Sequence, residues 1–82
     1  APALHRTLHA IGEQLQSGQR DYAALEINGV AKLEAAGLAP EYLAVRRALD
    51  LAEPDRDCDE IVVLAAATLG QTRLIDNIVV TI

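Results

Sequence analysis

The sequence predicts an α+β domain, with two N-terminal helices packed on a three-stranded antiparallel sheet whose last two strands form a hairpin. Three observations support this prediction. Apolar residues recur at helical spacing up to Gly37, the period shortens to two after Pro40, and Leu69-Gly70-Gln71 separates two apolar runs. The chain has 82 residues, which is the length of one small domain, so we expect residues 1–82 to form a single unit.

The first helix is predicted from four apolar residues that recur on one helical face: Leu4, Leu8, Ile11 and Leu15. Pro2 suits a helix start because its missing N–H needs no partner there. Ser17-Gly18 is expected to end the helix, since Gly18 can adopt the left-handed conformation found at helix C-termini.

A second helix follows, for which Asp21 is the expected N-cap. Gly29 lies on its apolar face and costs about 1 kcal/mol relative to alanine. We expect a close approach of the two helices to compensate for this cost. Gly37 is expected to end the helix, and Pro40 prevents it from resuming. The predicted apolar face consists of Tyr22, Leu25, Gly29 and Leu33.

Three strands are expected after Pro40. The first covers residues 42–46 and becomes less regular from Arg47 to Leu51; the second covers 61–68 and the third 72–82. The segment between the first two strands, residues 53–60, is expected to be a solvated loop. It contains Pro54 and closely spaced charges, namely Asp55, Arg56, Asp57 and Asp59.

The hairpin predicts which side chains share a face if Gly70 and Gln71 are its loop residues and Leu69 faces Thr72. One face then carries Ile61, Val63, Ala65, Ala67, Leu74, Ile78 and Val80. The other carries Val62, Leu64, Ala66, Ile75 and Val79, together with Arg73 and Asn77. Two short helices cover one face well, so our hypothesis is that the second apolar face docks on something outside this chain.

Composition excludes several classes of protein. A hydrophobic share of 51% excludes a disordered tail, and a net charge of −5 argues against binding to nucleic acid. No apolar run approaches the roughly 20 residues of a membrane span, and no secretory signal opens the chain, so we expect a cytoplasmic protein. Cys58 is the single cysteine, which excludes an intramolecular disulfide and a cysteine-based zinc site.

His5, His9 and Glu13 recur every four residues and are the candidate metal ligands. No fourth ligand is evident and the three residues flank the leucine stripe, so an ordinary solvated row is the preferred interpretation. The alternative, a small metal-binding regulator, predicts stabilisation by zinc.

Cys58 and two arginines are candidates for reactive or anion-binding groups. Asp57, Asp59 and Glu60 surround Cys58 and disfavour its thiolate, which argues against a nucleophile. Arg46 and Arg47 are adjacent in a strand and point to opposite faces, so we expect both to be solvated or ion-paired rather than to bind a phosphate or carboxylate.

Arg73, Asp76 and Asn77 lie in the last strand. In a regular strand Arg73 and Asp76 lie on opposite faces, so a direct bridge between them needs a bulge. Asp76 has apolar neighbours and needs hydrogen-bond partners, which indicates a structural anchor. We therefore predict no catalytic, cofactor-binding or metal-binding residue in this chain.

The segment Leu69-Gly70-Gln71-Thr72-Arg73-Leu74-Ile75-Asp76-Asn77 resembles the C-terminal signature of the pantothenate synthetases, the pantoate–β-alanine ligases. The likeness extends over nearly the whole chain. It includes the first helix from Ala1-Pro2-Ala3-Leu4, the junction from Leu15 through Gly18 to Arg20-Asp21, and the entry from Gly37 into Tyr42-Leu43-Ala44-Val45. Two positions depart from the family pattern: Arg47 replaces a usual Asp, and Asp50 replaces a common Thr.

The resemblance implies that the chain is the C-terminal lid domain of such a ligase. These enzymes use ATP and Mg²⁺ to form pantoyl adenylate and pyrophosphate, and β-alanine then displaces AMP to give pantothenate. Their N-terminal ATP-binding domain carries a His-x-Gly-His-type and a Ser-Ser-Arg-Asn-type motif, and this sequence contains neither. We therefore expect the ATP-binding domain to be the partner of this one. The isolated domain is then expected to bind no cofactor, to lack activity, and to self-associate through its exposed sheet face. The alternative is a free-standing homodimeric interaction module.

Overall fold

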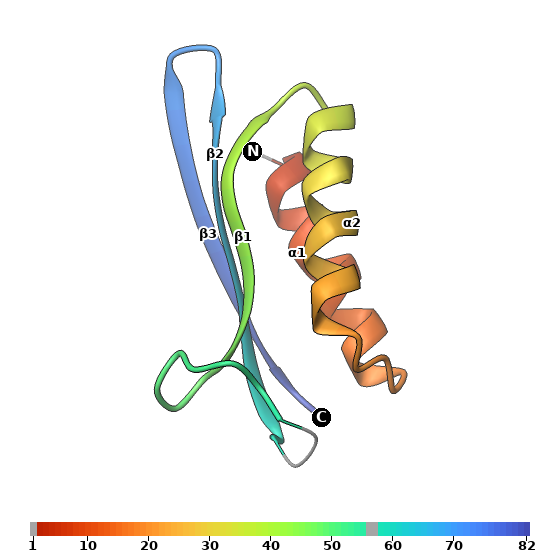
Figure 1. The fold of residues 1–82 in the computed structure, drawn as a ribbon. Helices are drawn as coiled ribbons and strands as arrows, with labels where there is room; N and C mark the ends of the chain where they lie inside the picture. Colours follow the sequence, from red (N-terminus) through yellow and green to blue (C-terminus); the bar gives the residue numbers. More distant parts are fainter. Residues whose placement is uncertain (1, 56–57) are drawn as a thin grey trace.

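The structure is a computed structural model that describes residues 2–55 and 58–82. Two helices are followed by one antiparallel sheet of strand order β1-β2-β3. Both helices lie on the same side of the sheet, and the two ends of the described chain lie at opposite ends of it (Figure 1). The predicted α+β fold is thereby confirmed. The elements are α1 (Pro2–Gln16), α2 (Tyr22–Ala35), β1 (Ala39–Arg47), β2 (Glu60–Leu69) and β3 (Thr72–Thr81).

The helix boundaries follow the sequence signals. α1 ends at Gln16, and Gly18 has a φ of 106°, as expected for a left-handed helix terminus. Asp21 caps α2, since its side chain accepts a hydrogen bond from the Ala24 amide at 3.2 Å. All four members of the α1 stripe are buried, with at most 3% of their surface exposed.

Gly29 allows α2 to pack closely on β1 and α1. A Cβ at this position would lie 2.6 Å from Leu43 Cδ1 of β1 and 2.9 Å from Ile11 Cδ1 of α1. The expected approach of the two helices is therefore present, but the nearer contact is with the sheet. A larger residue would force the Leu43 and Ile11 side chains apart.

The hairpin has the register that the sequence predicts. Leu69 pairs with Thr72, and the ladder runs without a shift to Glu60 and Thr81. The helix-facing side of the sheet forms the core with α1 and α2. Its buried strand residues are Leu43, Val45, Ile61, Val63, Ala65, Ala67 and Val80.

The first strand differs from the prediction. β1 begins at Ala39 rather than Tyr42, and Pro40 pairs with Ala67. The register shifts between Pro40 and Tyr42, so one extra residue, Glu41, stands in the strand as a bulge. A proline is tolerated there because β1 is an edge strand.

The segment between β1 and β2 is a loop, as expected, although Glu60 already belongs to β2. Arg56 and Asp57, two of the charges predicted there, lie outside the described residues. Within the described residues, no helix is long and apolar enough to cross a membrane.

Candidate functional site

The side of the sheet that faces away from the helices is the candidate functional surface, here called the open face. The register aligns its side chains in three rows that cross the strands. The rows are Tyr42–Ala66–Ile75, Ala44–Leu64–Asn77 and Arg46–Val62–Val79. These rows include every member of the second apolar face that was predicted from the hairpin except Arg73, which pairs with Thr68 beyond the first row.

The side chains of the open face are buried on the central strand β2 and exposed on the outer strands β1 and β3. Ala66 and Val62 of β2 are buried by their neighbours, with 0% and 9% of their surface exposed. Ile75 and Val79 of β3 are 60% and 59% exposed, and Tyr42 of β1 is 40% exposed. Large apolar side chains exposed on both outer strands of one sheet face are typical of a surface that binds another protein or domain.

The two arginines of the open face are already paired. Arg73 Nε donates to Glu41 Oε2 at 2.6 Å, and this contact raises the pKa of the Arg73 guanidinium. Arg46 Nη1 donates to Glu26 Oε2 at 3.1 Å. The open face therefore offers apolar contacts rather than an unpaired charge with which to hold a phosphate or carboxylate.

Asp76 acts as a structural anchor, as predicted, and does not contact Arg73. Its Oδ1 accepts from the Asn77 amide at 2.8 Å, and its Oδ2 lies 3.3 Å from Nδ1 of His5 on α1. Asp76 thus links the last strand to the first helix. Arg73 and Asp76 thus act on opposite faces of β3: Arg73 joins the strand to β1, and Asp76 joins it to α1.

The histidine row on α1 lies on the surface. His5 is paired with Asp76, whereas His9 Nδ1 lies 3.5 Å from Glu13 Oε1 on the next turn. The two histidine rings are 5.8 Å apart between centroids and are tilted by 52°. Among residues 2–55 and 58–82, no three His, Cys, Asp or Glu side chains gather closely enough to hold a metal ion.

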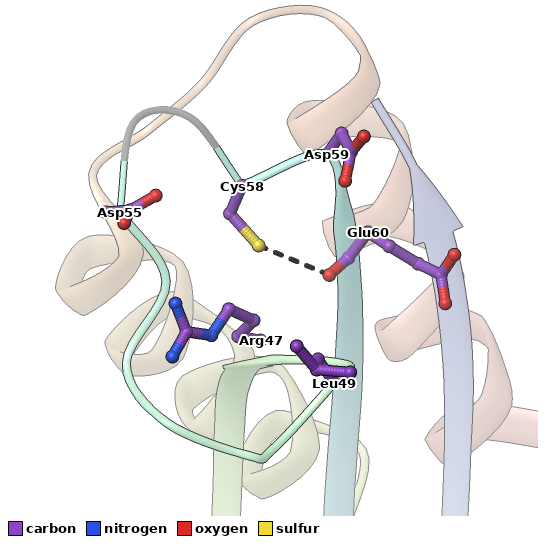
Figure 2. Close-up of a pocket in the computed structure, with 6 residues that line it drawn as sticks. All are labelled: Arg47, Leu49, Asp55, Cys58, Asp59 and Glu60. Carbon is purple, nitrogen blue, oxygen red and sulfur yellow. Dashed lines mark hydrogen bonds between the residues drawn. The ribbon is translucent and has the colours of Figure 1, made fainter.

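An open cleft of about 450 Å³ lies at the end of β1 beside the loop to β2. Figure 2 shows its lining residues, which are Arg47, Leu49, Asp55, Cys58, Asp59 and Glu60. Arg47 is held by Asp50 through two contacts, Nε to Oδ1 at 2.9 Å and Nη2 to Oδ2 at 2.6 Å. These bonds, with the Ala52 amide as a further donor to Asp50, lower the pKa of the Asp50 carboxyl to about 2.

Cys58 is not arranged as a nucleophile. It is half-buried, and its Sγ donates to the Glu60 carbonyl oxygen at 3.3 Å (Figure 2). The other charged groups that line the described cleft are one arginine and three carboxylates, and no histidine is among them. A thiol with no histidine beside it lacks the usual general base of a cysteine nucleophile.

Comparison with known proteins identifies the family. The sequence model described as pantoate-beta-alanine ligase matches residues 1–79. The chain belongs to the pantoate–beta-alanine ligase family. The resemblance seen in the segment from Leu69 to Asn77 is therefore confirmed over nearly the whole chain.

Relatives of the ligase family agree with this assignment. The pantothenate synthetase of Pseudomonas putida (strain W619) is 54% identical over 80 residues, which is 98% of this chain and 28% of the relative. That of Methylococcus capsulatus (strain Bath) is 44% identical over 82 residues, or 29% of its length. The crystal structure of pantothenate synthetase from Thermus thermophilus aligns with a TM-score of 0.80 and 28% identity, covering 95% of this chain and 28% of that one. The chain thus spans less than a third of these relatives.

Sequence reasoning missed two residues that shape this ligase-family domain. Glu26 of α2 accepts from the Val45 amide at 2.8 Å as well as from Arg46, and so joins the helix to the outer edge of β1. Glu41 occupies the bulge of β1 and binds Arg73. Each residue is only a charged position in the sequence, and its partner lies 19 or more residues away, so no local pattern reveals the contact.

Proposed function

We propose that this chain is the C-terminal domain of a cytoplasmic pantoate–beta-alanine ligase. The parent enzyme would condense pantoate with β-alanine, using ATP and passing through pantoyl adenylate, to give pantothenate, AMP and pyrophosphate. The observation that carries this proposal is the family match over residues 1–79 of a chain that spans only 28% of its relative from P. putida W619. Most of the enzyme, with its nucleotide-binding part, then lies outside these residues.

In this proposal ATP and Mg²⁺ bind outside the described residues. No acidic cluster of the size that a metal ion needs is present among them, and the two arginines of the open face are engaged by Glu41 and Glu26. We therefore assign ATP and Mg²⁺ to the remaining part of the enzyme. The isolated chain is expected to bind neither and to be inactive.

The role proposed for this domain is that of a lid. An acyl adenylate is lost if water reaches it, and a covering domain prevents that by excluding solvent. The open face suits this role because it is apolar and carries no unpaired cation among its described residues. In this proposal the open face lies against the nucleotide-binding part when the enzyme closes.

An intact ligase that carries this domain provides the test. Replacing Tyr42 or Ile75 by Glu places a charge on the open face, which should let water reach the adenylate. The expected result is AMP release in excess of pantothenate, against one AMP for each pantothenate in the unmodified enzyme. Ile27→Glu is the matched control, since Ile27 is 69% exposed but lies on α2. A ratio of one in both open-face variants would refute the lid role.

A free-standing homodimeric interaction module is the second candidate. The exposure of Ile75 and Val79 favours it, since a bare apolar surface is a common feature of dimer interfaces. The native gene distinguishes the two candidates. An in-frame upstream segment with both nucleotide-binding motifs supports the ligase domain, whereas a start codon just before Ala1 supports the module.

A further inference from the structure

The turn that follows β1, residues 47–52, exposes two leucines to solvent and is here called the leucine turn. Leu49 is 88% exposed and Leu51 is 57% exposed. Single apolar side chains on a surface are common, and a mobile loop can fold such a side chain away. Two of them on one short turn whose backbone is fixed are a different case, because their exposure is then built into the fold.

Hydrogen bonds fix the leucine turn in one conformation. The Arg47 amide donates to the Ala52 carbonyl at 2.7 Å, and the Leu51 amide donates to the Arg47 carbonyl at 2.8 Å. The Asp50 carboxylate accepts two bonds from the Arg47 guanidinium, at 2.9 and 2.6 Å, and one from the Ala52 amide at 3.1 Å. The leucines are therefore held outward by a preorganised backbone, which lowers the entropy cost of any contact that they make.

Leu51 has a backbone conformation that is unfavourable for a leucine. Its φ is 62°, and every other positive φ among the described residues belongs to a glycine. A Cβ is crowded in this left-handed region, so glycine or asparagine is the usual residue there. Burial does not compensate, since more than half of the Leu51 surface is exposed. Strain that serves no packing within the domain points to a role outside it.

The leucine turn lies at one end of the open face. It directly follows Arg46, which belongs to the row Arg46–Val62–Val79, and Val79 is itself 59% exposed. Figure 1 shows the turn, drawn in green, projecting from the end of β1 on the side of the sheet away from the helices. The turn therefore extends the exposed apolar surface of the open face beyond the end of the sheet.

We propose that Leu49 and Leu51 insert into an apolar recess on the remaining part of the ligase when that enzyme closes over its substrates. This inference rests on the proposed function, because the recess belongs to the part of the enzyme outside this chain. The contact would add to the lid role a specific point at which the closed form is held.

Two observations favour the rest of the enzyme as the occupant. The chain spans 28% of its relative from P. putida W619, so most of the polypeptide able to cover the turn lies outside these residues. A second copy of the chain offers no matching recess beside its own turn, since the cleft there is lined mainly by charged side chains (Figure 2). Protruding leucines need an apolar recess, because burying them against charged groups would desolvate those groups without partners.

Side-chain labelling of an intact ligase that carries this domain tests the contact. Hydroxyl radicals modify exposed side chains, and mass spectrometry locates the products. Adding ATP and pantoate should lower the labelling of Leu49 and Leu51 at least about threefold, as the core of an interface is shielded from solvent. Ile27 on α2 is 69% exposed and is the internal control, for which no change is expected.

Each labelling result decides between the proposals. Unchanged labelling of both leucines overturns the contact; if Tyr42 and Ile75 are nevertheless shielded, the lid role stands without it. Shielding of the leucines alone supports the contact and contradicts closure through the open face. Shielding that depends on enzyme concentration identifies a second copy as the occupant and overturns the proposal.

Two variants of the intact ligase supply a second readout. Leu49→Gln keeps the length of the side chain but not its apolar character, and Leu51→Gly also relieves the left-handed strain. Each should raise the KM for pantoate at least about threefold by depopulating the closed form, whereas Ile27→Gln should not. Leu51→Gly should leave the melting temperature unchanged or higher. An unchanged KM, or a lower melting temperature in Leu51→Gly, would show that the leucines serve no such contact.

Discussion

Arg73 of β3 binds Glu41 of β1 at 2.6 Å and so joins the two outer strands of the sheet across β2. Glu41 stands in the bulge of β1, between Pro40 and Tyr42. Arg73, which stands in the segment that resembles the family signature, therefore has a structural contact within the sheet. Both side chains are about half exposed, which limits what the pair contributes to stability.

Replacing Arg73 by Met should lower the melting temperature slightly, and only at low salt. The pair is exposed and therefore screened, so the difference from the unmodified chain should shrink as ionic strength rises. Glu41→Gln should have the same effect, and the double variant should be no worse than either single one. Equal losses at low and high salt would show that the pair is not the cause.

Glu26→Ala should cost roughly 1–3 kcal/mol of unfolding free energy, since it leaves the Val45 amide without its acceptor. Glu26→Gln keeps an acceptor oxygen and should cost less. Urea denaturation measures both, and the Val45 amide should exchange with solvent faster in the alanine variant. Glu34→Ala, an exposed change elsewhere on α2, is the control and should be nearly neutral. Unchanged exchange at Val45 would show that Glu26 does not hold the Val45 amide.

Gly29→Ala should destabilise the domain by up to about 2 kcal/mol despite the better helix propensity of alanine. The gain in propensity is roughly 1 kcal/mol, and the new Cβ would overlap Leu43 and Ile11 at a typical overpacking cost of about 1–3 kcal/mol. A double-mutant cycle identifies the cause: Leu43→Ala should cost less in the Gly29→Ala background than alone. Strict additivity would show that the overlap is not the source of the loss.

Stability should fall in acid partly because of Asp50. Its pKa is lowered from 3.8 to about 2 by Arg47 and the Ala52 amide, so between these values the unfolded chain binds more protons than the folded one. The contribution of Asp50 is therefore complete above pH 3.8 and disappears as pH falls toward 2. Asp50→Asn should flatten this part of the stability curve, as measured by urea midpoints from about pH 2 to 5. An unchanged slope would contradict the assignment.

The hairpin and the two faces of the sheet were predictable because they rest on local rules. Gly70 adopts a φ of 63° in a two-residue turn, and the period of two then fixes the face of every residue in β2 and β3. The apolar stripes of both helices were predictable for the same reason. The partners of Asp76 were not, because His5 precedes it by 71 residues.

The start of β1 was missed because Pro40 is normally a boundary signal. An edge strand tolerates the proline, and whether a strand lies at an edge depends on the order of strands in the sheet. The partner of Gly29 was only half predicted for a similar reason. Leu43 approaches it from the sheet, and no helical pattern contains that information.

The most direct test of the central claim is an activity assay of the folded 82-residue chain with ATP, Mg²⁺, pantoate and β-alanine. We predict no AMP and no pantothenate above the buffer background, and turnover once the nucleotide-binding part of the ligase is joined to the chain. Turnover by the chain alone would contradict the account, because it would place a complete catalytic site within these 82 residues.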